Sequence, residues 1–180
     1  MSRPRILGGT ARGRELRPPR SGTRPTPAKL REAVFNSLQF RSGRFLALFS
    51  GSGAMGLEAS SRGWTAVSVE LAGPAASIIR ENAQRLGLDL EVVRADALKY
   101  VQEHGGFDVV FASPAYDAPG FMSFYPRIVA AAPARPGGLY LLQHPTGSEL
   151  ASAELPDWAE VRRRVYGNNT LSVIAVPDGL

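Results

Sequence analysis

The sequence contains no cysteine and only two histidines, His104 and His144, among its 180 residues. The lack of cysteine excludes a disulfide framework, a thiolate nucleophile and a thiolate metal site, and two widely separated histidines do not form a metal cluster. We therefore expect chemistry without a metal. Long apolar runs are also missing: no stretch approaches the roughly 20 residues that span a membrane, and the arginine-rich N-terminus lacks the apolar segment of a secretory signal. We expect a cytoplasmic protein that does not bind membranes.

Acidic residues are scarce in the first quarter of the chain. Residues 1–44 contain eleven lysines and arginines against two acids, whereas residues 45–180 contain ten against fourteen, so a segment of charge +9 precedes a body of charge −4. A basic segment of this kind is typical of a protein that grips polyanions, because each phosphate contact by Arg or Lys releases counterions. The alternative is a solvated, disordered tail, which charge runs usually are.

This basic arm is patterned rather than monotonous. Residues 5–9 and 13–16 read as two short strands around a glycine turn, so we expect a β-hairpin that presents its arginines. Behind the arm, Thr26 is a suitable N-cap and Pro27 a suitable first residue for an amphipathic helix. The apolar side chains of that helix recur at helical spacing and are expected in the core: Leu30, Val34, Phe35 and Leu38.

Downstream, strand-like and helix-like segments alternate, as in a doubly wound α/β sheet. Strands are expected at residues 45–49, 65–69, 90–94, 107–112 and 139–144, and helices from residue 54 and over 72–86, 97–103 and 121–132. Two final strands, 159–166 and 170–176, are joined by Gly167-Asn168-Asn169, a hairpin signal. The pattern predicts one α/β domain with a Rossmann-like, seven-stranded, mostly parallel sheet that ends in an antiparallel C-terminal hairpin.

The first strand opens into a glycine turn and a helix. Gly51, Gly53 and Gly56 satisfy G-x-G-x-x-G, and such glycines let the backbone approach a ligand closely while the first N–H groups of the helix face it. Glu70 ends the second strand, where a carboxylate can accept both hydroxyls of a ribose. S-adenosylmethionine and NAD are both bound by this arrangement, and the glycine motif alone does not separate them.

The fourth strand runs directly into Ser113-Pro114-Ala115-Tyr116. Proline fixes φ, so the short side chain of Ser113 and the carbonyl of Pro114 point the same way and can hold a planar amino group, while the ring of Tyr116 can stack on a base. The alternative is a strand end with a proline turn, in which Tyr116 is a core aromatic. The turn resembles the (Asp/Asn/Ser)-Pro-Pro-(Tyr/Phe) motif of methyltransferases that act on exocyclic nitrogen.

Several short motifs along the chain are similar to one family. They are Arg5-Ile6-Leu7-Gly8-Gly9 with Arg12-Gly13-Arg14, Thr23-Arg24-Pro25-Thr26 with Arg31-Glu32-Ala33-Val34-Phe35-Asn36, Gly51-Ser52-Gly53 with Gly56-Leu57-Glu58-Ala59, Ser61-Arg62-Gly63, and Arg164-Val165-Tyr166-Gly167 with Thr170-Leu171. With these motifs the chain resembles, nearly end to end, the RsmD family of bacterial 16S ribosomal RNA guanine-N2 methyltransferases. The N-terminal motifs are the specific ones, because glycine loops recur in many unrelated enzymes.

The resemblance implies a class I S-adenosylmethionine-dependent methyltransferase fold in residues 26–180 and an RNA-gripping arm in residues 1–25. It implies that a monomer transfers a methyl group from S-adenosylmethionine to the exocyclic N2 of a guanosine in 16S ribosomal RNA, within a partly assembled small subunit. The cofactor residues are then Ser50, Gly51, Ser52, Gly53, Glu70, Asp96 and Ala97, and the catalytic residues are Ser113, Pro114 and Tyr116. The residues expected to contact RNA are Arg5, Arg12, Arg14, Arg17, Arg24 and Arg31.

In this assignment Glu70 holds the ribose and Asp96 lies beside the adenine; a helix N-cap is the alternative role for Asp96. Because a methyl group on sulfonium is already electrophilic, the enzyme mainly has to align an amine lone pair with it. Ser113 and the carbonyl of Pro114 then accept hydrogen bonds from the amine, and Tyr116 stacks on a guanine drawn out of its RNA context.

Two positions depart from the family pattern. Ala47 stands where the glycine-loop strand has an aspartate, and Ser113 begins a turn that normally reads Asp-Pro-Pro-Tyr. Both acids near the reacting methyl group are therefore replaced, and Asp117 is the neighbouring acid that can substitute, so we expect weak cofactor binding. Two alternatives stay open: a catalytically weakened or inactive RNA-binding relative, and an NAD-dependent oxidoreductase, for which only His104 and His144 offer a proton donor.

Overall fold

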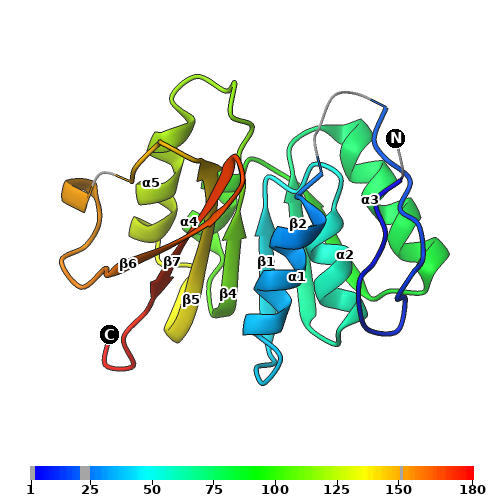
Figure 1. Ribbon diagram of the computed structural model, residues 1–180, viewed down its shortest axis with the longest axis horizontal. Helices are drawn as coiled ribbons and strands as arrows, with labels where there is room; N and C mark the ends of the chain where they lie inside the picture. Colours follow the sequence, from blue (N-terminus) through cyan, green and yellow to red (C-terminus); the bar gives the residue numbers. More distant parts are fainter. Residues whose placement is uncertain (1–2, 21–24, 151) are drawn as a thin grey trace.

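The computed structural model describes residues 3–20, 25–150 and 152–180. A seven-stranded sheet in the order β3-β2-β1-β4-β5-β7-β6 forms its centre (Figure 1). Five strands pair in parallel: β1 (Arg44–Leu48), β2 (Thr65–Glu70), β3 (Leu90–Arg94), β4 (Phe107–Ala112) and β5 (Ala134–Pro145). The hairpin of β6 (Val161–Tyr166) and β7 (Asn169–Ala175) pairs antiparallel with β5 through β7. The predicted mostly parallel sheet with an antiparallel C-terminal hairpin is confirmed.

Helices cover both faces of the sheet, because side chains alternate along each strand. α1 (Ala28–Ser37) and α2 (Ala54–Ser61) pack on the face that carries Phe45 and Ala47 of β1. α4 (Ala97–Glu103) and α5 (Phe124–Ala130) pack on the opposite face, which carries Leu46 and Leu48. α3 (Gly73–Leu86) lies against β2, β3 and α2. Because β1 to β5 run parallel, the loops that follow them all reach the same edge of the sheet. Ligands bind at this edge in this architecture.

Some element boundaries differ from the sequence prediction. α1 begins at Ala28, and its N-cap is Pro27 rather than Thr26, because the Pro27 carbonyl accepts the first helical hydrogen bond, from Arg31 N at 3.0 Å. The helix predicted over residues 121–132 is divided into a 3₁₀ turn, η1 (Phe121–Ser123), and α5. β5 begins five residues earlier than expected, because Ala134 pairs with Phe107 ahead of a register irregularity in β4. A second 3₁₀ turn, η2 (Ser152–Glu154), precedes β6.

The N-terminal arm packs along α2 and α3 (Figure 1). Its two predicted strands are reduced to one antiparallel bridge, between Arg5 and Glu15, because many of the arm's polar backbone groups bond to α2 and α3 instead. The tip of the arm lies at the C-terminal end of α2, where Thr10 N donates to the Ser61 carbonyl at 2.8 Å. Three apolar side chains are buried between the arm and these helices: Ile6, Ala11 and Leu16.

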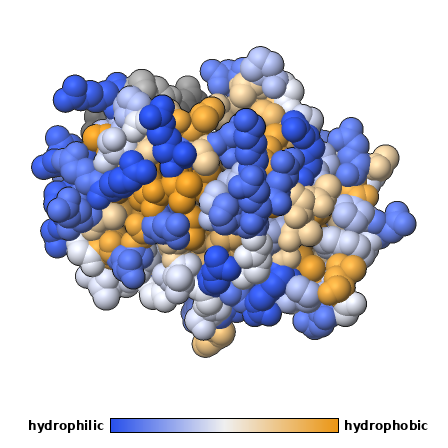
Figure 2. Space-filling model, turned by 180° about the vertical axis from the view of Figure 1, so that it is seen from behind, coloured by the Kyte–Doolittle hydropathy of each residue, from blue (hydrophilic) through white to orange (hydrophobic). Residues whose placement is uncertain are grey.

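The surface mixes apolar and hydrophilic side chains. Figure 2 shows the face behind the view of Figure 1, where apolar areas near the middle are crossed by hydrophilic side chains. Within the described ranges, no helix combines the length and the apolar character needed to cross a membrane.

Candidate active site

A cavity of about 950 Å³ lies at the carboxyl edge of the parallel strands. Its walls come from the loops after β1, β2, β3 and β4, from the end of β5, from the β6–β7 turn and from the segment that precedes α1. Almost all predicted cofactor and catalytic residues line it: Ser50, Gly51, Ser52, Glu70, Asp96, Ala97, Ser113, Pro114 and Tyr116. Gly53 is not among the lining residues; it is the left-handed N-cap of α2 directly behind the loop. One cavity thus joins the glycine loop to the Ser-Pro-Ala-Tyr turn.

The glycine loop is held in a tight, partly left-handed conformation. Phe49, Gly51 and Gly53 have φ angles of 54°, 52° and 76°, and a β-carbon on Gly53 would lie 2.7 Å from the side chain of Ile79. The loop is also tied to β2, because Ser50 N donates to the Val69 carbonyl at 3.0 Å. Glycine at position 53 is therefore required both by backbone conformation and by packing.

Glu70 fixes the loop from the end of β2. Its Oε2 accepts a hydrogen bond from Gly51 N at 2.7 Å, and its Oε1 accepts one from Ala72 N at 3.1 Å. A carboxylate oxygen can accept more than one hydrogen bond, so these contacts leave acceptor capacity toward the cavity. The neighbouring Leu71 is 64% exposed and lines the same cavity, where its side chain offers an apolar surface to a planar ring.

Asp96 takes the structural role that the sequence left as an alternative. Its Oδ1 accepts from Lys99 N at 3.0 Å, which makes it the N-cap of α4. The residue still lines the cavity, at the end of β3 and beside Ala97. Capping and adenine contact are compatible, because the cap uses one carboxylate oxygen and an exocyclic amine needs one acceptor.

The turn after β4 presents one buried and two accessible groups. Pro114 is buried, Ser113 is half-buried, and Tyr116 is 36% exposed, so Tyr116 is not a core aromatic. The Tyr116 hydroxyl donates to Asn169 Oδ1 at 2.9 Å, and its ring lies 5.7 Å from that of Phe121 at a tilt of 35°. Partial burial raises the pKa of Tyr116, with an opposing contribution from Gln143, so the phenol is neutral at physiological pH.

Gln143 and Asn169 were missed by the sequence analysis. Gln143 Nε2 donates to Asn169 Oδ1 at 3.1 Å, the same oxygen that accepts from Tyr116. Gln143 Oε1 is buried at the cavity wall without a partner among the described residues. The available signal was the polar pair Gln143-His144 at the end of an apolar strand, since a buried polar group without a partner is costly and marks a site of special function.

The two positions at which the family has an acid, Ala47 and Ser113, both line the cavity. Ala47 is 1% exposed, lines the cavity from β1 and also belongs to the apolar core beneath α1. Ser113 and Asp117 line the same cavity from the turn after β4, the strand that pairs with β1. The wall near Ala47 is therefore apolar.

Arg31 was predicted to contact RNA, and this prediction is wrong, because its side chain is buried in the interior. Its side chain is 2% exposed, and its Nη1 donates to Glu58 Oε2 at 3.2 Å and to the Arg5 carbonyl at 3.0 Å. Burial lowers the pKa of Arg31, and the Glu58 carboxylate opposes this effect. Arg31 therefore joins α1 to the arm and to α2.

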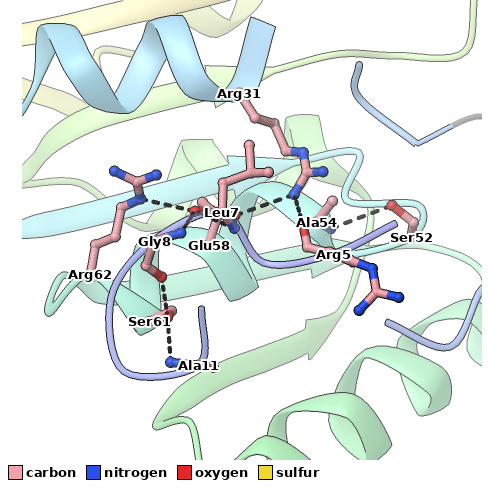
Figure 3. Close-up of polar contacts among 10 residues, drawn as sticks. All are labelled: Arg5, Leu7, Gly8, Ala11, Arg31, Ser52, Ala54, Glu58, Ser61 and Arg62. Carbon is pink, nitrogen blue, oxygen red and sulfur yellow. Dashed lines mark hydrogen bonds and ion pairs between the residues drawn. The ribbon is translucent and has the colours of Figure 1, made fainter. Parts of the chain in front are cut away.

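Glu58 is the centre of that contact (Figure 3). It is fully buried on α2 and accepts from the backbone N–H groups of Leu7 and Gly8 at 2.9 Å each, as well as from Arg62 Nε at 2.9 Å. Nearby on α2, Ser61 Oγ donates to the Gly8 carbonyl at 2.6 Å and accepts from Ala11 N. One carboxylate thus fixes the arm against the helix that carries the glycine loop at its other end.

The other arm arginines divide into two groups. Arg5 pairs with Glu15, and Arg17 pairs with Glu81 of α3. Arg12 and Arg14 are exposed and have no acidic partner among the described residues. Arg24 lies outside the described residues.

Comparison with known proteins places the chain in a family. A family model described as "conserved hypothetical protein 95" matches residues 4–175. The chain belongs to this family. The putative rRNA methyltransferase YlbH of Bacillus subtilis is 30% identical over 173 residues, which are 91% of this chain and 94% of that protein. The ribosomal RNA small subunit methyltransferase D of Escherichia coli is 36% identical over 119 residues, 62% of this chain and 60% of that protein.

A solved structure agrees with this family assignment. The putative methyltransferase yhhF from Escherichia coli matches with a TM-score of 0.84 and 25% identity, over 97% of this chain and 98% of that chain. The resemblance to the RsmD family inferred from sequence motifs is confirmed. The family match begins at residue 4, so it includes the arm as well as the sheet.

Proposed function

We propose that this protein transfers a methyl group from S-adenosylmethionine to the exocyclic N2 of a guanosine in 16S ribosomal RNA. The observation that carries the proposal is the single cavity in which the glycine loop, Glu70 and the Ser113–Tyr116 turn meet. The substrate class is supported by the relatives, whose names describe them as ribosomal RNA methyltransferases. We further propose that the enzyme works as a cytoplasmic monomer on partly assembled small subunits.

The cavity suits S-adenosylmethionine in size and in chemistry. Its volume of about 950 Å³ is at the upper end of ordinary ligand sites. The glycine loop offers close backbone approach, Glu70 and Asp96 offer acceptors for ribose hydroxyls and an adenine amine, and Leu71 offers an apolar surface. S-adenosylmethionine supplies an electrophilic methyl group on a sulfonium when bound.

The chain's own residues then position the nucleophile. Ser113 Oγ and the Pro114 carbonyl accept hydrogen bonds from the guanine amine, which fixes the direction of its lone pair. Tyr116 lies at the mouth of the cavity and stacks on the flipped base. The reaction releases one proton from the amine, and the acidic side chain nearest to this turn along the cavity wall is that of Asp117.

An NAD-dependent oxidoreductase is disfavoured by the position of the histidines. His104 stacks on Tyr100 at the end of α4, with ring centroids 4.0 Å apart. His144 is buried and bonded through both ring nitrogens to hydroxyls, with Ser148 at 3.0 Å and Ser172 at 2.8 Å. Neither histidine lines the cavity, so neither is placed to protonate a substrate carbonyl there.

Calorimetry with Glu70→Gln tests the cofactor. The wild-type protein should bind S-adenosylmethionine and not NAD. The variant should bind S-adenosylmethionine roughly tenfold more weakly, because the amide has one neutral oxygen acceptor in place of two charged ones. Glu91→Gln, on the exposed part of β3, is the matched control and should bind as the wild type does. Binding of NAD alone, or unchanged affinity in Glu70→Gln, would overturn the assignment.

The arm is proposed to contact ribosomal RNA through Arg12 and Arg14, which are exposed at its tip. Replacing both by alanine should weaken RNA binding and reduce the slope of log affinity against log salt by up to about two units. Cofactor affinity should not change, because the tip packs at the end of α2 away from the glycine loop. An unaltered salt slope would mean that the arm is merely solvated.

A further inference from the structure

The edge strand β6 carries three consecutive arginines, Arg162, Arg163 and Arg164. β6 pairs with β7 on one side only, because it is the last strand of the sheet. The four residues in its middle, 162–165, are all exposed. Side chains alternate along a strand, so these three guanidinium groups project to both faces of the sheet from one free edge.

These charges are nearly unbalanced. Of the acids in the described residues, Glu160 alone forms an ion pair with them, with Arg162 at 3.6 Å, and both side chains are 79% exposed. An exposed pair of this kind holds its partners weakly. Arg163 and Arg164 have no ion-pair partner there. Residues 45–180 are otherwise acidic, so β6 concentrates three of their ten positive charges.

The turn that follows β6 lines the active-site cavity. Three residues after Arg164, the chain turns at Gly167, and Asn168 and Asn169 then line the cavity. Thr146 holds this turn against the end of β5: its N donates to the Asn168 carbonyl at 3.0 Å and its Oγ1 to the Gly167 carbonyl at 3.1 Å. Burial lowers the pKa of His144 at the end of β5; the Pro145 carbonyl opposes this effect, and the positive charge of Arg163 adds to it.

The arm and β6 lie on opposite sides of the molecule (Figure 1). The arm packs on α2 and α3, next to the β3 side of the sheet, whereas β6 forms the other edge. The cavity opens between them, with walls that extend from the loop after β3 to the β6–β7 turn. A contact made by the arm alone would therefore leave the β6 side of the cavity without a polyanion-binding group.

We propose that β6 is a second RNA-binding surface, on which Arg163 and Arg164 bind phosphates of the nucleotides that flank the target guanosine. This inference rests on the proposed function for the identity of the polyanion. RNA fits because the edge presents cations on both of its faces, and the exposed large apolar residue on the strand is Val165. These contacts position the RNA so that the target base enters the cavity beside Tyr116 and Asn169.

Edge strands also carry charges for another reason, which is to prevent pairing with strands of other molecules. That role depends on the presence of charge and not on its sign. Arg163→Glu/Arg164→Glu keeps the edge charged and reverses its sign, so it separates the two roles. A protein whose edge is only protected would tolerate this change.

The experiment compares three variants with the wild type by RNA binding across a salt series, with a small-subunit RNA fragment as the probe. Arg163→Gln/Arg164→Gln should reduce the salt slope by roughly one to two units, and Arg163→Glu/Arg164→Glu should reduce affinity further. Arg41→Gln/Arg127→Gln removes two exposed arginines from the loop after α1 and from α5, and is the matched control. Melting temperature and calorimetric affinity for S-adenosylmethionine should be unchanged in all variants.

The outcomes separate this inference from the proposed function. A slope in the β6 variant equal to that of the control, or wild-type RNA binding without salt dependence, overturns the inference. Wild-type RNA binding that depends on Arg163 and Arg164, without methyl transfer, supports the surface and overturns the proposed activity. Dimers or higher oligomers of the glutamine variant with no loss of RNA affinity would show that the arginines serve only to protect the edge.

Discussion

Replacing Arg31 by alanine is expected to lower the free energy of unfolding by about 3–5 kcal/mol, because the change leaves a buried carboxylate without its buried cation. Glu58 is fully buried and Arg31 is 2% exposed, so water cannot replace the lost contact. For a domain of this size the melting temperature should fall by roughly 6–20 °C. Thermal unfolding followed by circular dichroism, with the wild type at the same pH and salt, measures the effect.

Arg62→Ala is the matched control, since Arg62 contacts the same carboxylate from a partly exposed position. The Arg62→Ala variant should lose clearly less unfolding free energy than Arg31→Ala, because water reaches the vacated side. RNA binding provides the second readout: the folded Arg31→Met variant should keep the salt slope of the wild type. A stable Arg31 variant whose salt slope falls by about one unit would show that Arg31 contacts RNA after all.

The position of Arg31 illustrates why charge pattern alone misassigned a residue. In the sequence it is one of eleven basic residues among the first 44, and nothing local distinguishes it from Arg12 or Arg14. Its partner is Glu58, 27 positions away on α2. Burial of an ion pair is decided by the tertiary packing of the arm, α1 and α2, which no short-range periodicity encodes.

The glycine loop and the turn after β4 were predictable because their signals are local in the sequence. Strand, glycine turn and helix are contiguous in sequence, and the rule that parallel strands present their following loops at one edge places Glu70, Asp96 and Ser113 together. Gln143 and Asn169 escaped because their contact depends on the antiparallel register of β5 and β7. The hairpin itself was readable from Gly167-Asn168-Asn169, but not which of its side chains would meet Tyr116.

Aspartate at positions 47 and 113 is expected to improve cofactor binding and turnover, because both positions line the cavity. Ala47→Asp should tighten S-adenosylmethionine binding by about tenfold to a hundredfold, since a charge-assisted hydrogen bond contributes about 1.5–3 kcal/mol. The carboxylate would meet the cationic methionine end of the cofactor at a position that is now apolar. Ser113→Asp should mainly raise turnover, because it orients the amine in the transition state rather than the cofactor in the ground state.

The same substitutions carry a measurable cost when the ligand is absent. Ala47 belongs to the core beneath α1, and a buried carboxylate without a partner destabilises the fold, so Ala47→Asp should melt at a lower temperature that saturating S-adenosylmethionine partly restores. Ala47→Asn is the matched control, because asparagine has nearly the same shape as aspartate without the charge. It should bind S-adenosylmethionine no more tightly than the wild type does. Calorimetry, methyl transfer to small-subunit RNA and melting curves measure the three effects. Lower stability with no gain in binding or rate would show that the site has been rebuilt around other groups, with Asp117 the acid that already lines it.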